Sequence, residues 1–172
     1  DVIYVMPGHS ETVIAAAGID LDVAGISVVG LGNGRNRPLI SFTTAVGADI
    51  DFDAANIKLT NFQLDTTGID ALTGPFDINA ADCEISHCEI LAADAGGQPT
   101  QLVVTATAAA RFKFVHNDVR SPDAGANSAI QLVGTEDGVE IGWNHIYGDF
   151  AVAGIENAAA NVLTNINIHD NY

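Results

Sequence analysis

The sequence predicts an all-β chain: a single-stranded right-handed parallel β-helix of about six coils, forming one domain over residues 1–172. Three observations favour this fold. Apolar residues alternate with polar ones at a period of two, which is typical of strands. A segment of similar pattern recurs every 26 to 31 residues. Finally, glycine, proline and aspartate gather between the alternating stretches, as in TTGIDALTG (66–74), which indicates turns.

The recurring segment has apolar residues at its first and third places. Its copies are ISVVGLGN (26–33), IKLTNFQL (57–64), CEISHCEI (83–90), FKFVHNDV (112–119), VEIGWNHI (139–146) and INIHDNY (166–172). The sixth place holds in turn Leu31, Phe62, Cys88, Asn117, Asn144 and Asn171. Such a repeat is typical of a solenoid, in which like residues stack from one coil to the next.

A second alternating stretch precedes each later copy, for example DIDFDAAN (49–56) and AIQLVGTED (129–137). These stretches predict further strands, so each coil is expected to hold two or three. VIAAAGI (13–19) comes nearest to a helical pattern, and Gly18 limits it. An antiparallel sandwich or jelly roll also has short strands between turns, but it predicts no column of like residues at a 27-residue interval.

Inward asparagines at the sixth place have a structural interpretation. Asn117, Asn144 and Asn171 are expected to form a ladder whose amides bond turn backbone groups that would otherwise be buried without partners. The apolar residues at the same place in the earlier coils fill the core. Cys83 and Cys88 lie five residues apart in one extended stretch, roughly 16 Å, so we expect two buried thiols rather than a disulfide.

The charge balance excludes some classes of partner. The chain has 22 acidic and 6 basic residues and a formal net charge of -16. Such a surface repels nucleic acid and anionic membranes, so we expect neither as a partner. No apolar run approaches the roughly 20 residues that span a bilayer, and the first residues lack the pattern of a signal peptide.

With the coils placed, the chain resembles the pectate-lyase-like superfamily of β-helices, and more narrowly the β-helical virion proteins of tailed bacteriophages. The opening DVIYVMPGHSET is similar to the D-x-I-Y-V-x-P-G segment that commonly begins the first coil, and IDLDVAGISVVGLGNGRNRPLI resembles phage coil repeats. The resemblance implies a structural protein, a homotrimer, capsid or tail proteins as partners, and a place on the virion surface or otherwise outside the cell.

The enzymes of this superfamily provide a comparison. Polygalacturonase-like members carry an Asp-Asp pair and a Gly-His-Gly, and neither occurs here. Pectate lyases combine a calcium site with a basic residue. Here Arg35 and Arg37 lie in a turn rich in glycine and asparagine, and we expect the other four basic residues not to gather with acids in one column. No catalytic residue is therefore carried over, and we predict none.

An acidic column is the feature of the early coils that most suggests a functional site. If Leu21, Val23, Ile50, Phe52, Phe76 and Ile78 point inward, the outward residues are Asp20, Asp22, Asp51, Asp53, Asp77 and Asn79. Stacked carboxylates raise one another's pKa unless a cation intervenes, and their hard oxygens suit Ca²⁺. We name Asp51, Asp53 and Asp77 as a calcium-type site, with a subunit-docking face and a solvated acidic face as the alternatives. Apart from this calcium we expect no cofactor.

A second column lies one place before the ladder and contains Gly30, Asn61, His87, His116, Trp143 and Asp170. His87, His116 and Trp143 form a candidate ligand or partner surface. The alternatives are a zinc site, an aromatic platform for a sugar, and packing against another subunit. The glycine-rich GLGNGRNRP (30–38) opens no helix, so we interpret it as a long turn rather than a dinucleotide site.

The leading hypothesis is a non-enzymatic structural protein of a phage particle, a capsid decoration or tail-associated domain. The alternative is a β-helix that binds or cleaves carbohydrate, as in tailspikes and polysaccharide lyases, and a bacterial adhesin would share the fold. The last segment stops within a coil, so we expect further chain, another subunit or an unusual end to cover it.

Overall fold

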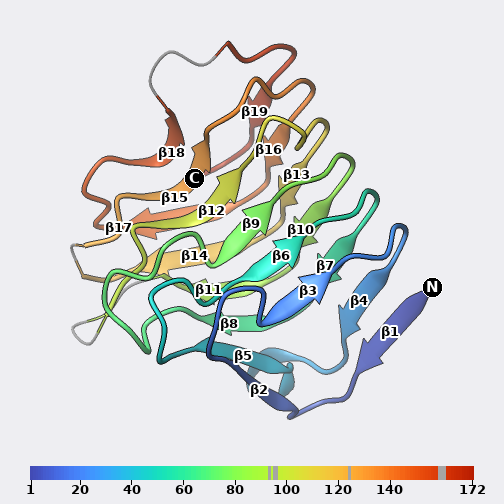
Figure 1. Cartoon of the computed structure of the whole chain (residues 1–172). Helices are drawn as coiled ribbons and strands as arrows, with labels where there is room; N and C mark the ends of the chain where they lie inside the picture. Colours follow the sequence, from blue (N-terminus) through green and yellow to red (C-terminus); the bar gives the residue numbers. More distant parts are fainter. Residues whose placement is uncertain (93, 95–96, 124, 159–161) are drawn as a thin grey trace.

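The computed structural model of the chain describes residues 1–92, 94, 97–123, 125–158 and 162–172. Its strands form three sheets, here named A, B and C, which run side by side along the molecule (Figure 1). Each coil contributes one strand to each sheet in turn, and the chain colour in Figure 1 advances coil by coil from the N-terminus to the C-terminus. The three sheets therefore enclose one continuous core.

Sheet A contains seven of the described strands. They are β1 (Val2–Val5), β4 (Ser27–Gly30), β7 (Lys58–Thr60), β10 (Glu84–Ser86), β13 (Lys113–Val115), β16 (Glu140–Gly142) and β19 (Asn167–His169).

Sheets B and C contain six described strands each. Sheet B is built from β2 (Ser10–Val13), β5 (Leu39–Phe42), β8 (Gln63–Asp65), β11 (Glu89–Leu91), β14 (Asp118–Ser121) and β17 (His145–Gly148). Sheet C is built from β3 (Ile19–Leu21), β6 (Ile50–Phe52), β9 (Phe76–Ile78), β12 (Gln101–Thr105), β15 (Ser128–Leu132) and β18 (Ala153–Asn157). A short 3₁₀ helix, η1 (Gly34–Asn36), lies in the predicted glycine-rich turn.

All pairs between these strands are parallel, and the register keeps like places together. Ile85 of β10, for example, pairs with Leu59 of β7 on one side and with Phe114 of β13 on the other. Six full coils are present and β19 begins another. The prediction of an all-β parallel β-helix of about six coils is confirmed. The antiparallel alternatives are wrong for this chain, because their strands would pair in opposite directions.

The core consists of the inward side chains of the three sheets. Phe42, Phe52, Phe76 and Phe114 are completely buried, and Phe42 packs edge-on against Phe76 with ring centroids 5.6 Å apart. Burying a large apolar side chain contributes about 2 to 3 kcal/mol relative to leaving it in water. Repeated in every coil, this burial is the main source of stability.

Most expected core positions are confirmed, but Leu31, which was expected to fill the core, is only half-buried. Leu21, Ile50, Phe52, Phe76 and Ile78 are buried, and both cysteines are buried and free. Val23, however, is 53% exposed, so the expectation that it points inward was wrong. The strand β3 ends at Leu21, and the alternation of faces does not extend past the end of a strand.

A tight turn joins sheet A to sheet B in successive coils. The residue at its corner has a left-handed backbone, with φ between 51° and 66° at Asn61, His87, His116, Trp143 and Asp170. This conformation turns the chain sharply, so the corner side chain stays outside while the next residue points inward. The turn therefore positions two columns of side chains, one on the outer surface and one in the core.

Among the described residues, no helix is long and apolar enough to cross a membrane.

Candidate functional site

The asparagine ladder, defined as Asn117, Asn144 and Asn171, runs through the interior beside the turn between sheets A and B. Asn117 Oδ1 accepts from the Cys88 backbone N–H at 2.9 Å, Asn144 Oδ1 from that of Asn117 at 2.9 Å, and Asn171 Oδ1 from that of Asn144 at 3.0 Å. The amide nitrogens donate to carbonyls of the same preceding coil, those of Ile85, Phe114 and Ile141, at 2.8 to 3.0 Å.

The ladder works because an amide both donates and accepts. Asn144 Nδ2 also donates to Asn171 Oδ1 at 2.9 Å, so identical neighbours bond to each other. Asn117 and Asn144 are at most 2% exposed, which makes each of these bonds costly to lose. These side chains bond one coil to the next, and both the oxygen and the nitrogen of each amide are engaged within the protein.

Three corner residues of the same turn and a histidine of β19 form a ring stack on the outside, defined as His87, His116, Trp143 and His169. His87 and His116 stack with centroids 4.9 Å apart, and His116 lies parallel to Trp143 at 5.0 Å. His169 meets Trp143 edge to face at 4.4 Å. The structure thus brings together the three predicted surface residues and adds a fourth that the sequence pattern did not indicate.

His169 was missed because it lies on β19, one residue before the corner. It is the register partner of Gly142. A Cβ at Gly142 would come within 2.6 Å of His169 Cε1, so the missing side chain makes room for the imidazole. The sequence signal for this ring was Gly142, which lies one coil before His169 and pairs with it in register.

The stacking limits what these rings can do. His116 is sandwiched between His87 and Trp143, so its two faces are not available to stack on a sugar ring. Stacked imidazoles also do not converge on a common point as zinc ligands do. Trp143 remains 45% exposed. Its use as a partner surface stays a prediction.

Three carboxylates line up on the outer face of sheet C and are named the acidic row: Asp20, Asp51 and Asp77. Asp51 is the register partner of the other two. Burial first, and then the charges of Asp49, Asp53, Asp77 and Asp20, raise the pKa of Asp51 from 3.8 to about 6. Burial likewise raises the pKa of Asp77. The row is therefore a place where negative charge accumulates.

The third predicted calcium ligand, Asp53, lies beside this row. Its Oδ1 accepts a hydrogen bond from Asn79 Nδ2 at 2.9 Å, which occupies one oxygen. Within the described ranges, no group of three or more His, Cys, Asp or Glu side chains is arranged to hold a metal ion. The calcium site at Asp51, Asp53 and Asp77 stays a prediction.

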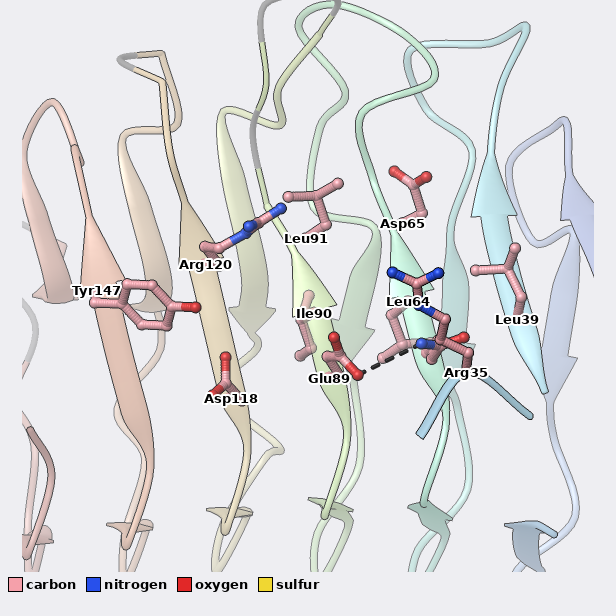
Figure 2. Close-up of a pocket in the computed structure, with 11 residues that line it drawn as sticks. Arg35, Leu39, Leu64, Asp65, Glu89, Ile90, Leu91, Asp118, Arg120 and Tyr147 are labelled. Carbon is pink, nitrogen blue, oxygen red and sulfur yellow. Dashed lines mark hydrogen bonds between the residues drawn. The ribbon is translucent and has the colours of Figure 1, made fainter. Parts of the chain in front are cut away.

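The outer face of sheet B holds a groove of about 390 Å³, named here the sheet B groove (Figure 2). It crosses five strands, from β5 to β17, and Arg35 reaches over it from η1. The lining residues are Arg35, Leu39, Gln63, Leu64, Asp65, Glu89, Ile90, Leu91, Asp118, Arg120 and Tyr147. The volume lies within the range of small-molecule sites, toward its lower end.

The acids of this groove have partners from the protein. Asp65 Oδ1 accepts from the Thr67 hydroxyl at 2.7 Å, and Glu89 accepts from Gln63 Nε2 at 3.4 Å. Asp118 lies 3.3 Å from His145 Nδ1, and Tyr147 stacks on that imidazole with centroids 4.1 Å apart. The acids and Tyr147 are thus oriented by neighbours before any ligand arrives.

The sequence pattern did not indicate this groove. Its residues come from a loop and five coils. Gln63, Glu89 and Asp118 share the seventh place of the recurring segment, but the sequence pattern assigns no role to that place. Glu89 and Arg120 would be expected only to face solvent, because they alternate with core residues. What draws them together is the register of β8, β11 and β14, in which Asp65, Leu91 and Arg120 are partners across neighbouring strands.

Comparison with protein-family models, curated proteins and solved structures finds no match for this chain. The phage resemblance therefore depends on the segments quoted from the sequence, and the fold on the parallel register of the three sheets.

Proposed function

We propose that this chain is a non-enzymatic structural element of a phage particle, a β-helical capsid decoration or tail-associated domain that assembles as a homotrimer and is displayed on the virion surface. The observation that supports this most is that its conspicuous polar side chains connect one coil to the next. The asparagine ladder does so inside, and the ring stack does so outside.

Ion pairs between coils support the same interpretation. On the outer face of sheet A, Lys58 pairs with Glu84 at 3.2 Å and Lys113 with Glu140 at 2.7 Å. Each pair joins neighbouring coils. A solenoid contacts only its nearest neighbours in sequence, so its resistance to local opening depends on such coil-to-coil bonds. A protein exposed on a particle outside a cell benefits from that resistance.

Assembly state provides the first test. Light scattering of the full chain across micromolar concentrations is expected to give three times the 17.8 kDa of one chain. A mass that stays at one chain over the whole range contradicts the homotrimer.

Location provides the second test. Antibodies raised against the chain are expected to label the surface of phage particles in electron micrographs of lysates from the source culture. Labelling of bacterial cell surfaces, with unlabelled particles, would instead favour the adhesin.

A further inference from the structure

The turn between β4 and β5 contains the one Asn-Gly pair of the chain, Asn33-Gly34. Both residues are exposed, as are Arg35 and Asn36 after them. Glycine has no side chain, so its amide nitrogen is less hindered than that of any other residue, and its backbone rotates more freely. An asparagine amide directly before such a nitrogen is open to attack from its own main chain.

The structure leaves both reacting groups of this pair without a partner. Asn33 precedes η1, but its side chain makes no hydrogen bond that caps this helix. The Gly34 backbone N–H donates to no acceptor among the described residues. A Cβ built on Gly34 would meet no atom within 4 Å, so that side of the residue is open. The nucleophile and the electrophile are therefore adjacent and unengaged.

Another asparagine with a small following residue shows the opposite situation. Asn127 precedes Ser128, which is buried and pairs with Gln101 in sheet C. The Asn127 carbonyl accepts from the backbone N–H groups of Val152 and Ala153 at 3.0 and 3.1 Å. The chain cannot rotate there without opening the sheet. What distinguishes Asn33 is therefore its place in an exposed turn as well as the glycine that follows it.

We propose that Asn33 is a self-modification site, at which the Gly34 nitrogen attacks the side-chain carbon Cγ of Asn33. The new N–Cγ bond closes a succinimide ring, the Cγ–Nδ2 bond breaks, and Nδ2 leaves as ammonia with the proton that Gly34 N–H gives up. Water then opens the ring. Attack of water at Cγ gives aspartate, and attack at the main-chain carbonyl carbon gives isoaspartate. Overall, one water is consumed and one ammonia is released.

The resting conformation of the turn slows this reaction without preventing it. The ring requires the Gly34 nitrogen in the plane of the Asn33 Cα–Cβ bond, whereas Asn33 has φ -135° and ψ 149°, an extended backbone that holds the nitrogen out of that plane. Rotation into the plane breaks the hydrogen bond from Asn36 N–H to the Asn33 carbonyl, which is 3.1 Å long. One exposed hydrogen bond is a modest obstacle.

The product changes the charge beside Arg35. Each modified chain gains one negative charge in addition to its formal charge of -16. Arg35 forms no ion pair within 4.0 Å with any described residue, and it reaches over the sheet B groove (Figure 2). Isoaspartate also lengthens the main chain of the turn that carries this arginine. Modification therefore alters one edge of the groove irreversibly as the protein ages, whether or not the chain belongs to a virion.

The test is to age the full chain at mildly alkaline pH and body temperature and to follow each asparagine by peptide mapping with mass spectrometry. We expect Asn33 to convert from amide to acid, with isoaspartate and aspartate both formed and ammonia released, while Asn127 keeps its amide. The rate should rise with pH, because the attack requires the Gly34 nitrogen to lose its proton. The free peptide GLGNGRN, residues 30–36, should react faster than the folded chain.

Matched variants separate attack by the main chain from simple hydrolysis. Gly34→Ala hinders the nitrogen and should slow the conversion about tenfold, which corresponds to about 1.4 kcal/mol in activation free energy. Asn33→Gln would have to close a larger ring, so position 33 should keep its amide. Ser128→Gly gives Asn127 a glycine neighbour within the sheet, and Asn127 should still not react. Circular dichroism checks the fold of each variant.

Three results would overturn the proposal. The first is an Asn33 that keeps its amide under conditions in which the free peptide reacts. The second is a Gly34→Ala variant that converts as fast as the parent chain. The third is aspartate formed without isoaspartate, which would show that water attacks the side chain directly.

Discussion

The asparagine ladder and the acidic row both stack like residues on neighbouring coils, yet their energetics are opposite. In the ladder, each amide donates to and accepts from its neighbours at 2.8 to 3.2 Å. In the acidic row each carboxylate can only accept, and the pKa of Asp51 rises to about 6. In-register stacking in a parallel β-helix repeats the interaction between two identical side chains from coil to coil, whether that interaction is attractive or repulsive.

Sheet A shows a third solution to the same constraint. Its outward column reads Lys58, Glu84, Lys113 and Glu140, so neighbours alternate in charge. The expectation that basic residues share no column with acids was therefore wrong for the two lysines. The hydrogen bond from Lys113 lowers the pKa of Glu140, and Glu140 in turn raises the pKa of Lys113. The acidic row on sheet C has no such alternation, so its like charges repel one another.

The largest expected effect comes from turning the ladder into an acidic column. Asn144→Asp keeps the shape but removes the Nδ2 donor to the Phe114 carbonyl and buries a charge. We expect the free energy of unfolding at pH 7 to fall by about 3 kcal/mol or more, because buried partners lose their bonds. Urea denaturation measures it. Asn167→Asp, at an exposed place on β19, is the control and should cost less than about 1 kcal/mol.

A smaller effect should follow when the alternating column becomes a like-charge column. Lys113→Glu removes the pair with Glu140 and places three acids in series on sheet A. Each exposed pair or repulsion is worth up to about 1 kcal/mol, so we expect a loss of about 2 kcal/mol. Lys113→Gln, which removes the pair without adding repulsion, should cost about half as much. Equal losses in the two variants would show that repulsion between coils is negligible.

Asp51→Asn is the reverse of the Asn144→Asp substitution, because it replaces a carboxylate with an amide. It should stabilise the protein. The folded state raises the pKa of Asp51 to about 6, so at pH 7 its charge opposes folding. Because this side chain is partly exposed, solvent screening reduces the gain to about 1 kcal/mol. Asp53→Asn is the control, since Asp53 already accepts from Asn79 and has less to gain. A destabilised Asp51→Asn would mean that the carboxylate has an attractive partner.

The pH dependence of that gain has a definite sign. Between the ordinary pKa of 3.8 and the folded value of about 6, the folded state binds a proton that the unfolded state does not. The contribution of Asp51 to stability therefore increases as the pH falls through this window. The difference in melting temperature between Asp51→Asn and the parent chain should shrink as the pH falls from 7 to 4, and a constant difference would contradict the assignment.

The smallest expected effect tests the calcium prediction. Salt should stabilise the parent chain relative to Asp51→Asn by a few tenths of a kcal/mol, through screening of the acidic row. If Asp51, Asp53 and Asp77 bind Ca²⁺, calcium chloride should raise the melting temperature more than sodium chloride at the same ionic strength. Equal shifts with the two salts would mean screening alone.

Some of these features could be predicted from the sequence. The spacing of Asn117, Asn144 and Asn171 indicates stacking without any coordinates, because coils of nearly constant length bring like residues into register. The row of Asp20, Asp51 and Asp77 follows from alternation within strands of known face. The inward assignment of Val23 failed because alternation does not show where a strand ends. His169 was assigned only to the last copy of the turn, because it lies one place away from the corner column.

The sequence by itself determined the coil, the inward column and the excess of negative charge, since the first two depend on residues repeated at a near-constant interval and the third on composition. Only the tertiary structure decided which side chains share the sheet B groove. Arg35 and Arg120 are 85 positions apart and belong to no repeat. They line one groove because the length of the loop before β5 and the parallel register of β8, β11 and β14 place them there, and no local pattern encodes that distance.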